Sequence, residues 1–444
     1  MGQTDLFPAV ESVEGSETET EGGTGKPRLR EANRKQVAFQ AFDLEQLIPP
    51  EHPARTLWAA VERLDLSRFH RAIAAREGRA GRDATDPKIL VCLWLFATAE
   101  GIGSARELDR MCKEHVAYRW ICGGVTVNYH LLAEFRVGHT DALDALLVDI
   151  LGRLFEAGLV TLRRVAHDGM RVRAAAGASS FRRKDPLKRA FREARRQVEH
   201  CKAQLENPTL LDQRKAAELR AAEDRQARLE RALKKMKVLE KARANDPNVS
   251  RRAKETRVST TDPDARVMKM PDGGFRPAYN VQLSTDVDSR VIVGVRVTDS
   301  GVDSPELIPT IDHLEDTFGT APEELLVDAG YVSLDGIAEA EQRDVRIYAP
   351  VPQRNVDTCD PHEPKPNDPV GVADWRQRMA TDDAKAIYKE RASTAETTNA
   401  DLREHRGLDR FNVRGPTKVL SVTLWGAIAY NLLRVPLEAL SLWS

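Results

Sequence analysis

Three acidic positions carry the residue types that a two-metal phosphoryl-transfer site requires. Asp168 closes a short apolar run predicted as a strand over residues 160–168, and Asp328 closes a second such run over residues 325–328. A later helix offers Glu390 and Glu396 as a third carboxylate. Mg²⁺ and Mn²⁺ prefer oxygen ligands, and two such ions about 3.5 to 4 Å apart stabilise the attacking and leaving oxygens of a phosphodiester. The pattern predicts metal-dependent phosphoryl transfer.

Helical geometry favours Glu396 as the third ligand. At roughly 100° per residue, Glu396 shares a helix face with Asn399 and Arg403, which gives it a positive neighbour. The same geometry places Arg391 roughly 140° round the helix from Glu396. We therefore predict Asp168, Asp328 and Glu396 as the metal ligands.

Each acidic residue also has a structural interpretation. A lone Asp after a strand is most often a turn former or a helix cap. Asp299 and Asp303 follow a Val-rich strand and could be alternative ligands, but Asp303 could equally cap the next helix. We interpret His167 as a packed or surface histidine and leave it out of the site.

The cysteines and histidines between residues 112 and 130 lack the spacing of a compact CxxC pair, so no zinc site is predicted.

The elements that precede the first acid are predicted to be helical. Residues 42–158 show helical patterning with proline-bounded starts and no long alternating runs. Ser104 and Glu107 form a capping box, and a second short helix over residues 126–136 suggests a helix-turn-helix. Four arginines could then contact a DNA end, or could be solvated residues of an ordinary bundle: Arg106, Arg110, Arg119 and Arg136.

A basic segment separates the first acid from the second. Residues 182–257 carry 24 basic and 12 acidic side chains, so this segment has a charge of +12 and the remaining residues sum to −13. Apolar residues recur with steps of three and four from Leu187 to Leu205 and from Leu219 to Met236, which predicts an antiparallel helical hairpin, a coiled coil. Such an arm could be merely solvated, could grip phosphates or could bind a second subunit.

The rest of the chain is predicted to be α/β. Period-two alternation over residues 276–297 predicts a β-hairpin, followed by helices over 304–318 and 334–342, a strand over 345–349 and one long helix over 375–406. The resulting fold class is α+β / α/β. The predicted domains are an acidic disordered tail (1–37), a helical N-terminal DNA-binding domain (38–158), a catalytic domain in two parts (159–180 and 258–444) and the basic hairpin inserted between them (181–257).

Composition bounds the compartment. The 444 residues carry a net charge of −1, and the five cysteines, Cys92, Cys112, Cys122, Cys201 and Cys359, form no CxxC pair. The acidic N-terminus lacks the basic start and apolar run of a signal peptide, and no run reaches the roughly 20 apolar residues of a membrane span. We predict a cytoplasmic protein without a membrane segment.

Four motifs in order resemble those of DDE transposases of bacterial insertion sequences. They are H-D-G (167–169), G-G-F-R-P-A-Y-N-V-Q (273–282), L-V-D-A-G-Y-V-S (326–333) and Y-x-x-R-x-x-x-x-E-x6-R (388–403). The resemblance extends from about residue 38 to residue 433. Four residues, rather than the three of the best-known branch, separate Arg391 from Glu396, and Arg403 stands where Lys is usual.

The resemblance implies an RNase H-like mixed-sheet catalytic domain and a function. Asp168, Asp328 and Glu396 would be the catalytic triad and hold two Mg²⁺ or Mn²⁺ ions, with Tyr388, Arg391 and Arg403 near the bound DNA end. The protein would bind terminal inverted repeats, cleave DNA and join it to a target, as a homodimer on DNA ends. Two alternatives remain: a nuclease of the same fold without strand transfer, and a non-catalytic DNA-binding protein derived from a transposase.

Overall fold

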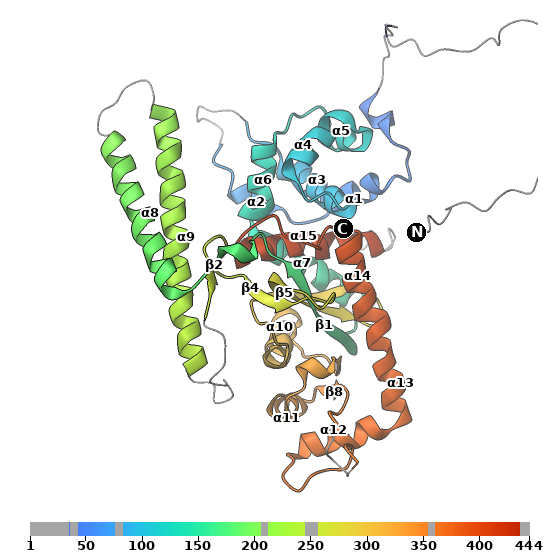
Figure 1. Ribbon diagram of the computed structural model, residues 1–444. Coiled ribbons are helices and arrows are strands. Elements are labelled where there is room, and N and C mark those ends of the chain that lie inside the picture. The colour runs from blue at the N-terminus through green and yellow to red at the C-terminus, as the bar shows by residue number, and fades with distance from the viewer. Residues whose placement is uncertain are drawn as a thin grey trace, which may run out of the picture. The chain divides into compact units, whose positions relative to one another are not determined.

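The computed structural model describes residue 35 and residues 43–75, 83–205, 212–244, 256–353 and 360–435 (Figure 1). The chain divides into two units, Met1–Phe42 and Asp43–Ser444, and every element given below belongs to the second. The predicted acidic tail lies outside the described residues apart from Lys35, and so does Cys359. In the described part of the chain, no helix has both the length and the apolarity to cross a membrane.

The described residues between 44 and 156 form mainly helices, as their patterning predicts. α3 is the central helix of this segment because residues 89–98 are all buried. Pro87 occupies its first position and Asp86 caps it by accepting a hydrogen bond from the Lys88 N–H at 2.8 Å. The elements are η1 (Leu44–Leu47), α1 (Pro53–Glu62), α2 (Ser67–Arg71), α3 (Pro87–Ala99), α4 (Ala105–Glu114), α5 (Val116–Cys122), α6 (Tyr129–Gly138) and α7 (Thr140–Glu156).

The predicted helix-turn-helix is wrong in its connection. The Ser104 hydroxyl caps α4 with a hydrogen bond of 3.4 Å, as predicted, and Asn128 caps α6. A further helix, α5, lies between them in the chain and packs against α4. The His115 side chain caps α5, and Gly123 ends it in the left-handed conformation, with φ of 54°. The two predicted helices are therefore separated by α5 rather than joined by a tight turn.

A mixed sheet forms the centre of the remaining chain. β1 pairs antiparallel with β5 and parallel with β7, and β7 pairs parallel with β8. β4 and β6 both pair antiparallel with β5, β4 along residues 275–278 and β6 along residues 280–285. The strands are β1 (Arg164–Arg173), β4 (Arg266–Lys269), β5 (Phe275–Asp286), β6 (Ile292–Thr298), β7 (Glu324–Leu326) and β8 (Arg346–Tyr348). β1 therefore lies in the interior of the sheet.

The first strand differs from its prediction. It was expected over residues 160–168 with Asp168 at its end, whereas β1 begins at Arg164 and continues to Arg173. Beyond Asp168 the chain keeps a period of two, with Met170 and Val172 buried and more polar residues between them. The long strand β5 pairs with β1 as far as Arg173. Asp168 consequently lies in the middle of a strand, paired with Leu283 of β5 on one side and two residues beyond the last pair with β7 on the other.

Helices cover the sheet and continue the chain beyond it. The predicted single helix over 375–406 is wrong: Thr381 leaves the helical conformation and its hydroxyl caps the next helix at the Ala384 N–H, 3.2 Å away. A π-helical turn, Ala392–Glu396, then joins two α-helices. The elements are η3 (Ser304–Glu306), α10 (Leu307–Phe318), η4 (Ala329–Tyr331), α11 (Leu334–Gln342), α12 (Val370–Ala380), α13 (Asp382–Arg391), α14 (Thr397–Glu404) and α15 (Pro416–Arg434).

The basic segment forms two long helices, α8 (Lys184–Leu205) and α9 (Asp212–Ala244), which lie side by side (Figure 1). Leu187, Ala194, Leu229 and Met236 of the predicted seam are buried between them. Short strands β2 (Phe181–Arg182) and β3 (Val258–Ser259), with the turn η2 (Ala178–Ser180), close the base of the hairpin. The predicted hairpin is thus present.

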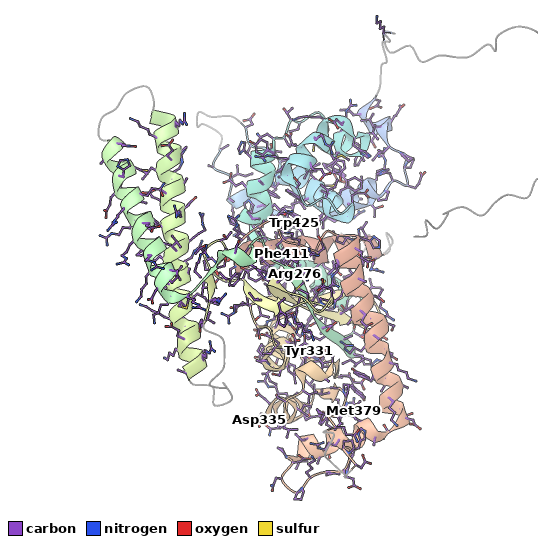
Figure 2. The ribbon with its side chains drawn as sticks, viewed as in Figure 1. Arg276, Tyr331, Asp335, Met379, Phe411 and Trp425 are labelled. Carbon is purple, nitrogen blue, oxygen red and sulfur yellow. The ribbon has the colours of Figure 1, made fainter. Side chains whose placement is uncertain are left out.

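The last helix, α15, fastens the edge of the sheet. Trp425, labelled in Figure 2, is fully buried on this helix. The buried side chain of Asn431 accepts a hydrogen bond from the Ile292 N–H and donates one to the Ile292 carbonyl, both at 2.9 Å. These are the two backbone groups that a further strand would pair with at the edge of β6. One amide side chain therefore satisfies two buried backbone groups that no strand covers.

Replacing Asn431 should reveal this role. We expect Asn431→Leu to lower the free energy of unfolding by on the order of 2–6 kcal/mol, because two buried backbone groups lose their partners. Asn431→Asp keeps an acceptor for the Ile292 N–H and should fall between wild type and Asn431→Leu. Chemical denaturation measures the three values. Equal stability of Asn431→Leu and wild type would show that the two hydrogen bonds between Asn431 and the Ile292 backbone contribute nothing to stability.

Candidate active site

Two of the three predicted acids lie on neighbouring strands. The last paired residues of β1 and β7 are Ala166 and Leu326, and Asp168 and Asp328 each follow two positions later. Parallel strands keep such equal offsets side by side. Asp328 lies just beyond β7, as predicted, and caps η4 by accepting a hydrogen bond from the Gly330 N–H at 2.7 Å. The sheet register therefore brings the two carboxylates together.

Asp168 is held by three donors. Its Oδ1 accepts from the Gly169 N–H at 3.0 Å and lies 3.3 Å from the Arg391 guanidinium, and its Oδ2 accepts from Asn399 at 2.9 Å. Burial raises the pKa of Asp168 to about 6, against the opposing effect of Arg391 and with a further rise caused by Asp328. Most of the rise in this pKa reflects burial, and the neighbouring Asp328 charge adds to it.

The π turn brings Arg391 and Glu396 onto one face, which corrects the predicted angle of 140°. A π turn accommodates one residue more than an α turn, so residues five apart stack as residues four apart do in an α-helix. The Arg391 guanidinium lies 3.6 Å from the Glu396 carboxylate and also contacts Asp168. The fourth residue between Arg391 and Glu396 is thus absorbed by the π turn.

The two candidate glutamates have different environments. Glu390 accepts from Arg164 at 2.7 Å, and Arg164 also pairs with the buried Glu324 at 2.6 Å. Glu390 therefore belongs to an ion-pair network at the start of β1. Glu396 is 65% exposed and its only ion pair among the described residues is with Arg391. Glu396, unlike Glu390, is therefore outside the Arg164–Glu324 network and lies beside Arg391, which also contacts Asp168.

Of the three predicted DNA-contacting residues, Tyr388 and Arg391 lie beside the acids and Arg403 does not contact them. Burial raises the pKa of Tyr388, Arg391 opposes the rise, and the charges of Asp328, Asp168 and Glu396 add to it. The phenol of Tyr388 therefore lies within the field of all three acids. Arg403 makes no hydrogen bond or ion pair with these acids within the described ranges. The predicted role of Arg403 as the positive neighbour of Glu396 is therefore wrong, since Arg391 takes that place across the π turn.

A fourth carboxylate, Asp303, stands beside the site. Its Oδ1 accepts from Asn280 at 2.6 Å and its Oδ2 accepts from Arg171 at 3.0 Å. It makes no capping hydrogen bond to the helix that follows, contrary to the capping interpretation. Its charge also raises the pKa of Asp168. The alternation of the polar residues Asn280 and Gln282 within an apolar strand was the available sequence signal for this network.

Asp299, the other alternative ligand, instead pairs with Lys235 of α9 at 2.7 Å.

Gly169 is required by close packing at this network. A Cβ at position 169 would lie 2.7 Å from Asn280 Oδ1, 2.7 Å from Gln282 Nε2 and 2.9 Å from Asp303 Oδ1. Real Cβ atoms do not approach polar atoms so closely, so any side chain would displace the network. The glycine after Asp168 is therefore explained by contact rather than by backbone conformation.

The residues offer oxygen donors that suit a hard divalent cation. Asp168, Asp328 and Glu396 are carboxylates, and the buried Asn399 Oδ1 beside them has no hydrogen-bond partner among the described residues. Within that same part of the chain, no group of three His, Cys, Asp or Glu side chains is clustered tightly enough to form a metal site by itself. The donor chemistry fits the predicted ions, with Glu396 turned toward Arg391.

Two family models match the chain. Residues 42–137 match the transposase domain family DUF772, and residues 370–435 match a transposase DDE domain family. The first match spans η1 to α6, and the second spans α12 to α15 with Tyr388, Arg391 and Glu396. Together the matches support a DDE transposase of the insertion-sequence type. Comparisons with curated proteins and with solved structures give no match.

Arg290 should hold the π turn in place. Arg290 lies in the turn between β5 and β6 with φ of 63°, and donates to the Ser393 carbonyl at 2.7 Å and to the Thr394 hydroxyl. We expect Arg290→Ala to speed amide hydrogen exchange at residues 392–398 by about tenfold, because about one hydrogen bond of stabilisation is lost.

Arg163→Ala is the matched control, since Arg163 contacts Asp288 of the same turn at 3.4 Å and is not in contact with the π turn. Equal exchange at residues 392–398 in both variants would contradict the role of Arg290.

His167 should stay neutral in the folded protein. It is buried, bonded to Ser284 at 2.9 Å and to Gln282 at 2.8 Å, and burial lowers its pKa to about 3. A folded-state pKa below the unfolded value of about 6.5 means that this contribution to stability is present above pH 6.5 and is lost as pH falls toward 3. NMR titration of the ring should show no protonation down to pH 5, whereas a midpoint near 6.5 would contradict this environment.

Proposed function

We propose that this protein is a DNA transposase that binds the terminal inverted repeats of an insertion sequence, cleaves DNA and joins it to a target. The observation that carries the proposal is that Asp168 and Asp328 each lie two residues beyond the last pair of β1 and β7, with Arg391 reaching both Asp168 and Glu396. The strand order β6-β5-β1-β7-β8, antiparallel on one side of β1 and parallel on the other, supports an RNase H-like catalytic domain.

Asp168, Asp328 and Glu396 would hold two Mg²⁺ or Mn²⁺ ions. When bound, such ions supply Lewis-acid stabilisation of the charge that develops on phosphodiester oxygens. With a pKa of about 6, Asp168 is ionised at neutral pH and able to act as a ligand. Asn399 and the Gly169 N–H fix the orientation of its carboxylate. The fold thus prepares one ligand rigidly and leaves Glu396 exposed.

The remaining side chains suit contact with the DNA end. Tyr388 stays a neutral phenol because burial and the nearby acids raise its pKa. Arg391 carries a positive charge between two carboxylates, and would be drawn to a phosphate as Glu396 turns to a cation. Arg403 would contact the DNA further along α14. Binding of two DNA ends would involve a homodimer, in the cytoplasm at the nucleoid.

Substitution of the acids should abolish chemistry and preserve DNA binding. We expect Asp328→Asn and Glu396→Gln to reduce Mg²⁺-dependent strand cleavage by about 100-fold or more, because several kcal/mol of transition-state stabilisation are lost. Glu404→Gln is the control, since Glu404 is exposed at the end of α14. The substrate is a pair of inverted repeats identified by sequencing the DNA on both sides of the reading frame.

The products and the binding constants separate the alternatives. Cut ends joined to a second DNA indicate a transposase, and cut ends that are never joined indicate a nuclease. Tight binding by the wild type without cleavage would establish the non-catalytic DNA-binding protein. Cleavage that survives in both acid variants would show that Asp328 and Glu396 are not the ligands.

A further inference from the structure

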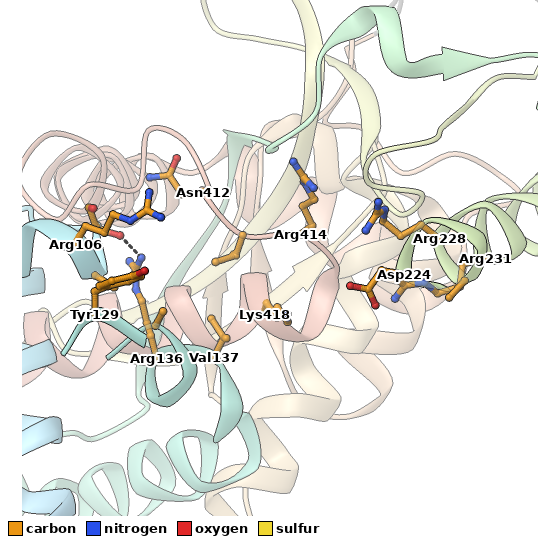
Figure 3. Close-up of a pocket in the computed structure, with 16 residues that line it drawn as sticks. Arg106, Tyr129, Arg136, Val137, Asp224, Arg228, Arg231, Asn412, Arg414 and Lys418 are labelled. Atoms are coloured by element: carbon orange, nitrogen blue, oxygen red, sulfur yellow. Dashed lines mark hydrogen bonds between the residues drawn. The ribbon is translucent and has the colours of Figure 1, made fainter. Parts of the chain in front are cut away.

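A basic cleft lies apart from the acidic site. It has a volume of about 810 Å³ and is lined by α4, α6, α9 and the chain around the start of α15 (Figure 3). Six lining side chains are cationic: Arg106, Arg136, Arg228, Arg231, Arg414 and Lys418. Asp224 is the one carboxylate among the lining residues. This excess of positive charge identifies an anion-binding surface.

Several of these cations lack a counter-charge. Arg228, Arg231 and Lys418 form no ion pair with any residue in the described ranges, although the same helix α9 carries paired cations such as Lys234 with Glu230 at 3.0 Å. Arg106 of α4, Arg231 of α9, and Arg414 and Lys418 around the start of α15 are exposed. Exposed cations gathered from three parts of the chain create a field that attracts a polyanion. Part of the positive charge of the hairpin, on Arg228 and Arg231 of α9, therefore lines this cleft.

The cleft is built to hold its cations in place. Arg136 is buried against the Trp94 ring at 4.7 Å and donates to the Gly103 carbonyl, and burial lowers its pKa to about 10. Arg414 donates to the Ala175 carbonyl at 3.3 Å. The adjoining Gly415 N–H donates to the buried Asp262 at 3.3 Å. These contacts fasten the loop before α15 to the base of the hairpin.

The chemistry of the cleft favours a phosphate backbone over bases. Tyr129 is the one aromatic residue among the lining residues, and the Arg106 guanidinium lies over its ring at 5.0 Å. The neighbouring His130 ring is also close to it, with centroids 4.0 Å apart. Binding of single strands depends on aromatic faces that are free to stack on bases. A covered ring and several cations instead suit contacts to phosphates, which are sequence-independent.

β1 connects the cleft to the acidic site. The loop that lines the cleft follows Arg410, which pairs with Arg173 at the end of β1. Asp168 lies five residues earlier in the same strand, which is roughly 17 Å at 3.3 Å per residue. That distance corresponds to about five base-pair steps of duplex DNA. One DNA segment could span both sites.

We propose that this cleft binds the sugar-phosphate backbone of duplex DNA beside the segment that is cut, with α9 of the hairpin as one wall. This inference rests on the proposed function for the identity of the polyanion. It assigns the hairpin a binding surface and limits that surface to the α9 side. The cations of α8 that lie outside the cleft are then ordinary solvated charges.

The test compares two double variants with a matched control. Arg228→Gln with Arg231→Gln removes two charges from the α9 wall, and Arg414→Gln with Lys418→Gln removes two from the opposite wall. Arg189→Gln with Arg192→Gln removes two exposed charges, also three residues apart, from α8 outside the cleft. Duplex DNA of arbitrary sequence is the probe, and its affinity is measured between 50 and 200 mM salt.

Each cleft variant should lower the slope of log affinity against log salt by about 1 to 2, since each lost phosphate contact removes roughly 0.9. The α8 control should keep the wild-type slope. A slope that falls equally in all three variants, or in none, would overturn the cleft assignment. Failure of the wild type itself to bind duplex DNA would instead overturn the proposed function, so the two failures are distinguishable.

Discussion

The structure of the site depends on a half-buried carboxylate, Asp168, in the middle of an interior strand. The pKa of Asp168 is raised from 3.8 to about 6, so its ionisation costs about 3 kcal/mol of stability above pH 6, and this cost disappears as pH falls toward 4. Contacts with Arg391, Asn399 and the Gly169 N–H limit this cost of ionising Asp168. All three donors are placed by backbone that packs on β1 or belongs to it. The contacts of Asp168 with Arg391 of α13 and Asn399 of α14 therefore constrain how these two helices pack on β1.

The π turn is the clearest result of that constraint. Arg391 must reach Asp168 from α13, and Asn399 must reach it from α14, eight residues later. In a continuous α-helix, eight residues rotate by roughly 80° beyond two full turns. The π turn reduces this rotation by taking up one extra residue, which aligns both donors with β1. Arg290, on a hairpin of the same sheet, satisfies the Ser393 carbonyl in that turn.

The elements with a strong period were predictable, and the site only in part. Alternation identified β5 and β6, and the apolar run before Asp328 identified β7, because burial in a sheet selects these patterns. The rotation between Arg391 and Glu396 was not predictable, since the arithmetic assumes 3.6 residues per turn and a π turn has no simple sequence signal. Asp303 was ambiguous because capping and a side-chain network use the same residue type before a helix. The short helix α5 was hidden because it ends in two glycines.

Acidic residues that bind a metal cation also repel a polyanion such as DNA. In this chain the acidic and the basic side chains are concentrated in different places. Burial is the main cause of the raised pKa of Asp168, and the nearby charges of Asp328 and Asp303 raise it further. Attraction for DNA must then come from cations placed elsewhere. Arg173, which pairs with Arg410 just before the loop that lines the cleft, lies roughly 17 Å along β1 from Asp168, which exceeds the Debye length of about 8 Å at physiological salt. Exposed charges at such a separation are largely screened from one another, so the basic cleft and the acidic site coexist in one chain without neutralising each other.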